Sequence, residues 1–99
     1  MVRKIIWSLN VKKHRLEILQ YWIDRNKSTI FSKKLNTLFI EAIKLIALNP
    51  SIGHLTETEN IRVKIIRDYL VVYEIKEEEI HILCIFDGRR NPEMLKKIF

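Results

Sequence analysis

Hydrophobic and polar positions follow two different periods along this chain, helical in the first half and alternating in the second. Between positions 11 and 26, Leu16, Leu19 and Ile23 recur at helical spacing, with Ile18 and Trp22 beside them. A second apolar series repeats at intervals of three and four residues, the period of an amphipathic helix. This series consists of Phe31, Leu35, Leu38, Phe39, Ala42, Ile43 and Ile46. The pattern predicts two amphipathic helices.

Polar residues and a proline mark the ends of these helices. We expect Asn10 to be the N-cap of the first helix, and Ser28 or Thr29 to cap the second. The second helix should end at Asn49-Pro50, because proline has no N–H to continue it. Since only a short break over residues 26–29 separates the helices, the sequence predicts an antiparallel helical hairpin.

Strand-like segments precede and follow this hairpin. Arg3–Trp7 reads as a first strand, and residues 50–60 read as a loop. Short turns at residues 67–68 and 76–79 should join the later segments into an antiparallel meander. These segments are Ile61–Ile66, Tyr69–Lys76 and Ile80–Phe86. The predicted fold class is therefore α+β: an N-terminal strand, an antiparallel helical hairpin, a three-stranded antiparallel meander and a short C-terminal helix, in one domain over residues 1–99.

The alternation along the meander assigns its residues to two faces. The face against the hairpin is expected to carry Ile61, Val63, Tyr69, Val71 and Tyr73, with Trp7 and Trp22 also in the core. A terminal helix with Met94, Leu95, Ile98 and Phe99 should cover part of the other face. That face is expected to carry Leu70, Val72, Leu83 and Ile85. Because so many apolar residues should not remain in water, a partner segment is expected to bind there as well.

Composition and charge narrow the class of protein. The net charge is +6, with ten basic and three acidic residues in positions 1–49 against eight and nine in positions 50–99. The basic half indicates either a solvated helix surface or attraction to an acidic partner. A single cysteine, Cys84, in an apolar segment favours a reduced, cytoplasmic protein. The apolar stretch near the N-terminus is too short for a signal peptide or a membrane span, so no membrane association is expected.

Arginines at the end of the last strand are the leading candidates for function. The segment Asp87-Gly88-Arg89-Arg90-Asn91-Pro92 places two guanidinium groups on a rigid support, and such groups suit phosphate and carboxylate. The alternative is that one of them pairs with Asp87 or Glu93 and fixes the turn. The predicted anion- or target-binding set is Arg62, Lys64, Arg67, Arg89 and Arg90. Of these, Arg62, Lys64, Arg89 and Arg90 are expected to converge on one anionic group.

Histidine and cysteine offer little further chemistry. His81 could pair with Glu74 on the neighbouring strand, either as a general base or as a structural pair. His81 and Cys84 should lie on opposite strand faces, so no metal site is predicted. His14 has no partner by spacing. No phosphate loop, Ser-His-Asp arrangement or zinc spacing occurs in the sequence, and no cofactor is expected.

The order of elements and several short motifs resemble the RelE/ParE superfamily of type II toxin–antitoxin toxins. The most specific are Val63–Ile75 and Asp87-Gly88-Arg89-Arg90-Asn91-Pro92-Glu93. Weaker markers are Ile6-Trp7-Ser8, Tyr21-Trp22-Ile23, Asn49-Pro50 and Gly53. The resemblance implies a bacterial growth inhibitor from a plasmid-stabilization type of module, neutralised by a cognate antitoxin with an acidic segment. It leaves the formation of a homo-oligomer open.

The superfamily contains two modes of action. RelE-like members cleave messenger RNA in the ribosome, and here Lys64, Arg62, Arg90 and His81 would be the catalytic candidates. However, Leu70 occupies the position of an arginine early in the third strand, and the terminal helix has no tyrosine. The ParE-like branch, which resembles this chain more closely, poisons DNA gyrase by binding. We therefore expect a ParE-like, non-enzymatic toxin, with RNA cleavage or an inactive toxin-fold binding module as alternatives.

Overall fold

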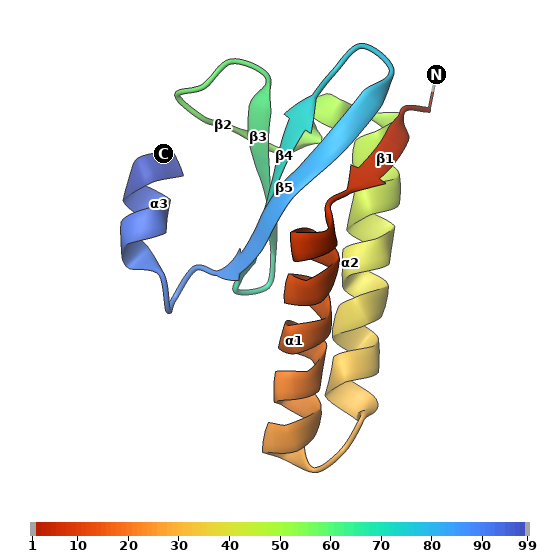
Figure 1. Cartoon of the computed structure of the whole chain (residues 1–99), viewed down its shortest axis with the longest axis vertical. Helices are drawn as coiled ribbons and strands as arrows, with labels where there is room; N and C mark the ends of the chain where they lie inside the picture. Colours follow the sequence, from red (N-terminus) through yellow and green to blue (C-terminus); the bar gives the residue numbers. More distant parts are fainter. Residues whose placement is uncertain (1, 99) are drawn as a thin grey trace.

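The computed structural model describes residues 2–98, apart from the side chains of Leu95, Lys97 and Ile98. Figure 1 shows a twisted sheet with a long helical hairpin, α1 and α2, packed on one side. The elements in chain order are β1 (Lys4–Trp7), α1 (Leu9–Asn26), α2 (Ile30–Leu48), the 3-10 turn η1 (Pro50–Ile52), β2 (His54–Leu55), β3 (Ile61–Ile66), β4 (Tyr69–Ile75), β5 (Glu79–Asp87) and α3 (Pro92–Ile98). The predicted α+β class and the predicted order of elements are confirmed.

The sheet has the strand order β1-β5-β4-β3-β2. β3, β4 and β5 form the predicted antiparallel meander, and β1 lies parallel to β5 at the far edge. A parallel pair needs a long crossover connection, and the helical hairpin begins that crossover. The expected loop over residues 50–60 also contains the short strand β2, which pairs with β3 at Arg62 and Val63.

Helix ends differ from the expectation by only a few residues. Ser8, not Asn10, caps α1, because the backbone N–H of Val11 donates to Ser8 Oγ over 3.1 Å. Before α2, Ser28 Oγ accepts from the backbone N–H of Ile30 over 3.2 Å, while Thr29 makes no side-chain cap bond. α2 ends immediately before Asn49-Pro50, as predicted.

The larger core lies between the hairpin and the sheet. Its helical members include Val11, Leu35, Phe39 and Ile46, which have no exposed surface. Each such side chain contributes about 1.5–3 kcal/mol when it is buried. Leu16, which was expected to face this core, is 64% exposed. Trp7 and Trp22 are half-buried at its margin. The sheet contributes Ile66, Tyr69, Val71, Tyr73, Ile80, Ile82 and Ile85.

The assignment of β3 to the hairpin face is wrong. Ile61 and Val63 belong to a second cluster on the other face, with Leu70 and Val72. The two-residue turn after β3 sets Val63 opposite Val72, so odd-numbered residues of β3 share a face with even-numbered residues of β4. Arg62 and Lys64 consequently lie on the hairpin side of the sheet.

A β-bulge in β5 explains why Ile85 also lies on the opposite face from the one expected. Val72 pairs with Cys84, and the next residue, Tyr73, pairs with Ile82. Leu83 is therefore the extra residue of the bulge, and it is 42% exposed. The bulge reverses the alternation beyond it, so Ile85 joins the hairpin core and is 4% exposed.

The second face is smaller and includes two of the four residues predicted to bind an antitoxin, Leu70 and Val72. Figure 1 shows α3 away from the hairpin, beyond the sheet, and the expectation that this helix covers the second face stays a prediction. Leu70 and Val72 lie on this side but are each only 5% exposed, so they have little surface to offer a partner. The rest of the predicted apolar stripe of α3, Leu95, Ile98 and Phe99, lies outside the described side chains. No helix in the described part of the chain is long and apolar enough to span a bilayer.

Candidate functional site

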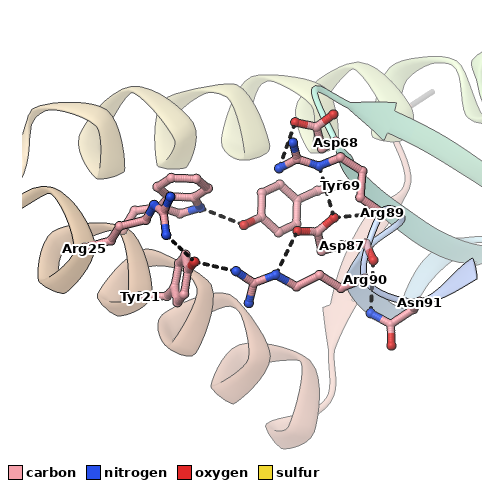
Figure 2. Close-up of polar contacts among 9 residues, drawn as sticks. Tyr21, Arg25, Asp68, Tyr69, Asp87, Arg89, Arg90 and Asn91 are labelled. Atoms are coloured by element: carbon pink, nitrogen blue, oxygen red, sulfur yellow. Dashed lines mark hydrogen bonds and ion pairs between the residues drawn. The ribbon is translucent and has the colours of Figure 1, made fainter.

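The candidate site lies where β5 ends, beside the β3–β4 turn and the second half of α1 (Figure 2). Its central group is Asp87, whose side chain is 11% exposed. Asp87 Oδ1 accepts from the backbone N–H of Arg89 over 2.9 Å and lies 3.8 Å from Arg89 Nε. Asp87 Oδ2 lies 3.7 Å from Arg90 Nε. Both arginines therefore pair with Asp87, which matches the structural alternative considered for them.

Further contacts join the two turns that flank the site. The N–H of Gly88 donates to the Asp68 carbonyl over 2.9 Å, and Arg89 Nη2 lies 3.3 Å from Asp68 Oδ2. Asn91 Nδ2 donates to the Asp87 carbonyl over 3.0 Å. The direction in which the two arginines leave β5 is thus fixed by the β3–β4 turn. The arginine side chains themselves remain more than 60% exposed, so most of their donors are available to a ligand.

Arg90 also contacts Tyr21 of α1. Its guanidinium carbon lies 4.5 Å from the centre of the Tyr21 ring, and Arg90 Nη2 donates to Tyr21 Oη. Arg25 Nη1 donates to the same oxygen over 3.4 Å. The hydrogen bond from Arg90 is the main reason that the pKa of Tyr21 falls below its usual value of 10.0. A cation held against an aromatic ring in this way is a good surface for a planar or anionic group.

An aromatic series links this surface to the core. Trp22 packs edge-on against Tyr21, with ring centres 5.2 Å apart. Trp22 Nε1 donates to Tyr69 Oη over 2.7 Å, and Tyr69 in turn packs against Phe39. Burial raises the pKa of Tyr69. The pKa values of the two hydroxyls therefore shift in opposite directions, downward for Tyr21 and upward for Tyr69.

A hollow of about 340 Å³ opens between α1 and the end of β5. Its α1 side carries His14, Glu17 and Tyr21, which are three and four residues apart and so lie on one helix face. Its remaining lining consists of Ile18, Tyr69, Ile85, Phe86, Asp87, Arg90 and Asn91. The sequence reading missed this group because it treated His14 alone. The helical spacing of His14, Glu17 and Tyr21, next to the apolar stripe of the same helix, is the sequence feature that could have indicated this group.

The other predicted cations lie elsewhere. Arg62 Nη1 donates to the carbonyls of Ser51 and Gly53 over 3.1 and 2.9 Å, so it holds the turn before β2. Lys64 and Arg67 line a hollow against α2 that contains neither Arg89 nor Arg90, although Arg67 directly precedes Asp68, the ion-pair partner of Arg89. Arg62 therefore has a structural role, and Lys64 and Arg67 line a different hollow from the one at the end of β5.

His81 is not part of the candidate site either. It lies opposite Glu74, as predicted, but its Nε2 contacts Glu79 Oε1 over 3.0 Å, while Glu74 pairs with Lys76. His81 precedes Asp87 by six residues along β5, a separation of about 20 Å at 3.4 Å per residue.

The expected convergence of the four basic residues is wrong. Arg62 lies across from Tyr73, which pairs with Ile82, five residues before Asp87. That offset along the strands is about 17 Å. Arg62 thus cannot share one small anion with Arg89 and Arg90, and Lys64 lines a different hollow from the one that contains Arg90. Among the described residues, no group of three or more His, Cys, Asp or Glu could hold a metal ion.

Comparison with known proteins decides the family. The sequence model described as "ParE toxin of type II toxin-antitoxin system, parDE" matches residues 5–92. The chain belongs to the ParE toxin family. Among solved structures, the chromosomal ParDE TA system from P. aeruginosa superposes with a TM-score of 0.73 at 17% identity, over 87% of this chain and 96% of that chain. At this identity the likeness shows a shared fold. No curated protein matches the sequence.

Membership in this family confirms the resemblance to the ParE-like branch. The chain is a type II toxin of the ParE-like kind, and a toxin of this kind has an antitoxin partner. The arginine turn of this ParE toxin, which was its most specific motif, is the part that the structure anchors to Tyr21 and to the β3–β4 turn.

Proposed function

We propose that this ParE toxin inhibits growth by binding DNA gyrase in the cytoplasm, as a single domain and without chemistry of its own. The observation that carries the proposal is the separation of its basic residues into unconnected groups. Arg89 and Arg90 are held by Asp87, whereas Arg62 is occupied by backbone carbonyls on another strand. Exposed, well-oriented arginines suit recognition of an acidic surface.

RNA cleavage by attack of a 2′-hydroxyl needs more than recognition. A base, a cation and an acid must all reach one phosphate. Here the equivalent of the arginine early in the third strand is Leu70, which is apolar and 5% exposed. His81 lies about 20 Å from the end of β5. Each missing donor costs about 2.7–4 kcal/mol of transition-state stabilisation, so the set inherited from RelE-like members would be a poor catalyst.

One observation favours RNA cleavage as a second candidate. The hollow beside Arg90 also contains His14, Glu17 and Tyr21, and Arg90 lowers the pKa of Tyr21. These residues offer a base, a cation and a phenol within one cavity. They are not at the positions that RelE-like members use, so such a site would be a substitute for the usual one.

The proposal is tested by adding the purified toxin to two assays. In the first, purified gyrase supercoils relaxed plasmid, and both supercoiling and trapped cleaved DNA are measured. In the second, a translating extract is scored for cleaved message. We expect loss of supercoiling or trapped DNA breaks, and intact message. Cleaved message with normal supercoiling would instead support the RNA-cleaving alternative, and no effect in either assay would indicate an inactive binding module.

Paired variants show which surface acts. Arg89→Ala with Arg90→Ala removes two charges at the candidate site. Lys12→Ala with Lys13→Ala removes two exposed charges from the opposite end of α1 and serves as the matched control. We expect the first pair to lose gyrase inhibition about tenfold or more, as for two charge-assisted contacts. Equal losses in both pairs would show that only net charge matters.

A further inference from the structure

Basic side chains surround the end of the sheet at which β4 begins and β5 ends. Tyr69 pairs with Asp87 at this end, and Figure 1 shows that the hairpin continues past it. We call this surface the basic belt. Its basic members are Arg25, Lys33, Lys34, Lys64, Arg67, Arg89 and Arg90, and the carboxylates among them are Asp24, Glu41, Asp68 and Asp87. With seven basic residues against four acidic ones, the belt has a net charge of +3.

The α2 side of the basic belt borders two neighbouring hollows. Lys33, Lys34 and Arg67 line the first, of about 480 Å³. Lys64 and Arg67 line the second, of about 350 Å³, and Glu41 is the acidic residue in both linings. Within residues 2–98, none of these four cations forms an ion pair. Their charge is therefore available to an outside anion.

The α1 side of the basic belt is joined to the α2 side through the β3–β4 turn. Asp68 of that turn pairs with Arg89 over 3.3 Å. Arg90, the next residue, donates to Tyr21 Oη, and so does Arg25. The side chains of both arginines after β5 are more than 60% exposed. Contact by contact, the belt therefore runs from α2, around the end of the sheet, to α1.

The opposite end of the sheet is acidic. It lies about 20 Å away, because Tyr69 and Ile75, at the two ends of β4, are six residues apart. Ile61 pairs with Glu74 at that end, so the loop before β3 and the β4–β5 turn both lie there. Its acidic residues are Glu57, Glu59, Glu74, Glu77, Glu78 and Glu79, and its basic residues are Arg3, Lys4, Arg62 and Lys76. With six acidic residues against four basic ones, this end sums to −2, so a polyanion is attracted to the belt and away from this end.

The spread of the belt over several elements suits a polyanion better than a single small anion. No one phosphate can contact cations on α1, α2, β3 and the segment after β5. Duplex DNA carries one negative charge per about 1.7 Å of its axis, so successive phosphates can each meet a different cation. Interfaces with DNA are also much more positively charged than those between proteins, which are depleted of lysine.

We propose that the basic belt contacts the phosphate backbone of duplex DNA without reading its sequence. The lysines and the exposed arginines pair with phosphates, and Tyr21 holds the guanidinium of Arg90 in place for one of them. The choice of DNA among polyanions rests on the proposed gyrase target and deepens it, because gyrase acts on duplex DNA. The toxin would then contact the DNA that gyrase holds as well as the enzyme.

Fluorescence anisotropy tests the DNA contact without gyrase. The full-length toxin is titrated into a short fluorescein-labelled DNA duplex at several salt concentrations. We expect a dissociation constant of roughly 10⁻⁴–10⁻⁶ M at physiological salt, and a slope of log K against log salt of about −4, from four or five phosphate contacts at about −0.9 each. A slope shallower than about −2, or no binding at about 50 mM salt, would overturn the proposal. Tighter binding to polyglutamate or to single-stranded RNA than to the duplex would also overturn it, because the belt would then suit another partner.

Paired lysine variants locate the contact on the molecule. Lys33→Ala with Lys34→Ala is compared with Lys12→Ala with Lys13→Ala, which removes the same charge from a part of α1 outside the belt. We expect the first pair to make the salt slope shallower by about 2, one for each lost phosphate contact, and the control pair to change it by less than about 0.5. Equal changes in both pairs would show that net charge alone attracts DNA, and would overturn the assignment to the belt.

The DNA contact and the gyrase target fail separately in these assays. Inhibited supercoiling by a toxin that does not bind the bare duplex would overturn the role of the belt and leave the gyrase target standing. Binding to the duplex with normal supercoiling would support the belt and count against the gyrase target.

Discussion

Tyr73 connects the core of the sheet to the turn that precedes β2, and its hydroxyl is the most informative group to remove. Its ring has no exposed surface. The hydroxyl donates to the Pro50 carbonyl over 2.5 Å and accepts from the N–H of Gly53 over 3.0 Å. Because β2 follows directly after Gly53, this one oxygen helps to set where β2 begins and hence how much of the β3 edge stays open.

The cost of Tyr73→Phe follows from the two partners that it leaves behind. Pro50 and Gly53 are buried, so neither can bond to water in place of the hydroxyl. An unsatisfied buried polar group costs about 1–3 kcal/mol, and two of them give a loss of about 2–6 kcal/mol. Near the middle of that range, a domain of this size would lose about 15–30 °C in Tm.

Urea unfolding followed by tryptophan fluorescence measures the change, and Gly53→Ala supplies an internal check. A Cβ at Gly53 would lie 2.9 Å from Tyr73 Cε1 and still closer to the hydroxyl. Gly53→Ala should therefore cost about 1–3 kcal/mol through overpacking. It should cost clearly less when Tyr73→Phe is already present, because the nearest atom is gone. A loss under about 0.5 kcal/mol for Tyr73→Phe, or strict additivity of the two changes, would refute this account.

The tyrosines, Asp87 and Cys84 each give a measurable outcome. In an ultraviolet titration, Tyr21 should deprotonate below 10.0 and Tyr69 and Tyr73 above it, and Arg90→Ala should return the pKa of Tyr21 toward 10.0. The pKa values of Tyr69 and Tyr73 are raised by folding, so their contribution to stability is present below pH 10.0 and is lost as the pH rises through the pKa values of the folded protein. The pKa of Tyr21 is lowered by folding, so its contribution to stability is present above pH 10.0 and is lost as the pH falls through its folded pKa. Asp87→Ala should cost about 1–2 kcal/mol in urea unfolding, because the N–H of Arg89 loses its acceptor, whereas Asp24→Ala, at an exposed helical pair, should change little. Burial raises the pKa of the Cys84 thiol, so that thiol should react with a disulfide reagent at pH 8 more slowly than an unfolded control, and equal rates would contradict its burial.

Local sequence pattern was sufficient for the elements and for their order. The helical period of α2 and the proline that follows it locate that helix to within a residue. Both signals come from residues that lie close together in the sequence, so one sequence is enough to recognise them. The parallel pairing of β1 with β5 could not be read in the same way, because it joins residues about 75 positions apart, such as Lys4 and Glu79.

Two local details account for the wrong faces. The tight turn at Arg67 and Asp68 fixes whether odd or even residues of β3 match those of β4, and the register places Ile66 opposite Tyr69. The bulge at Leu83 then reverses the pattern within β5. Alternation within one strand predicts which residues share a face, but only the register between strands says which face that is.

The contacts of the charged residues at the candidate site also could not be predicted from local sequence. Sequence alone located Arg89 and Arg90 and offered Asp87 as a partner, but their other partners are Asp68 for Arg89 and Tyr21, 69 residues away, for Arg90. The positive charge of the first half was also visible in the sequence, but not its grouping: folding brings Lys33 and Lys34 of α2 toward the end of β3, beside an open strand edge. The arginines of the turn are partly neutralised by two aspartates, whereas the charged lining of the two hollows between α2 and β3, which consists of Lys33, Lys34, Lys64, Arg67 and Glu41, sums to +3. An acidic group is therefore attracted more strongly to these hollows than to the turn. The turn, with its stacked and oriented guanidinium groups, is better suited to recognition by shape and hydrogen bonding than by net charge.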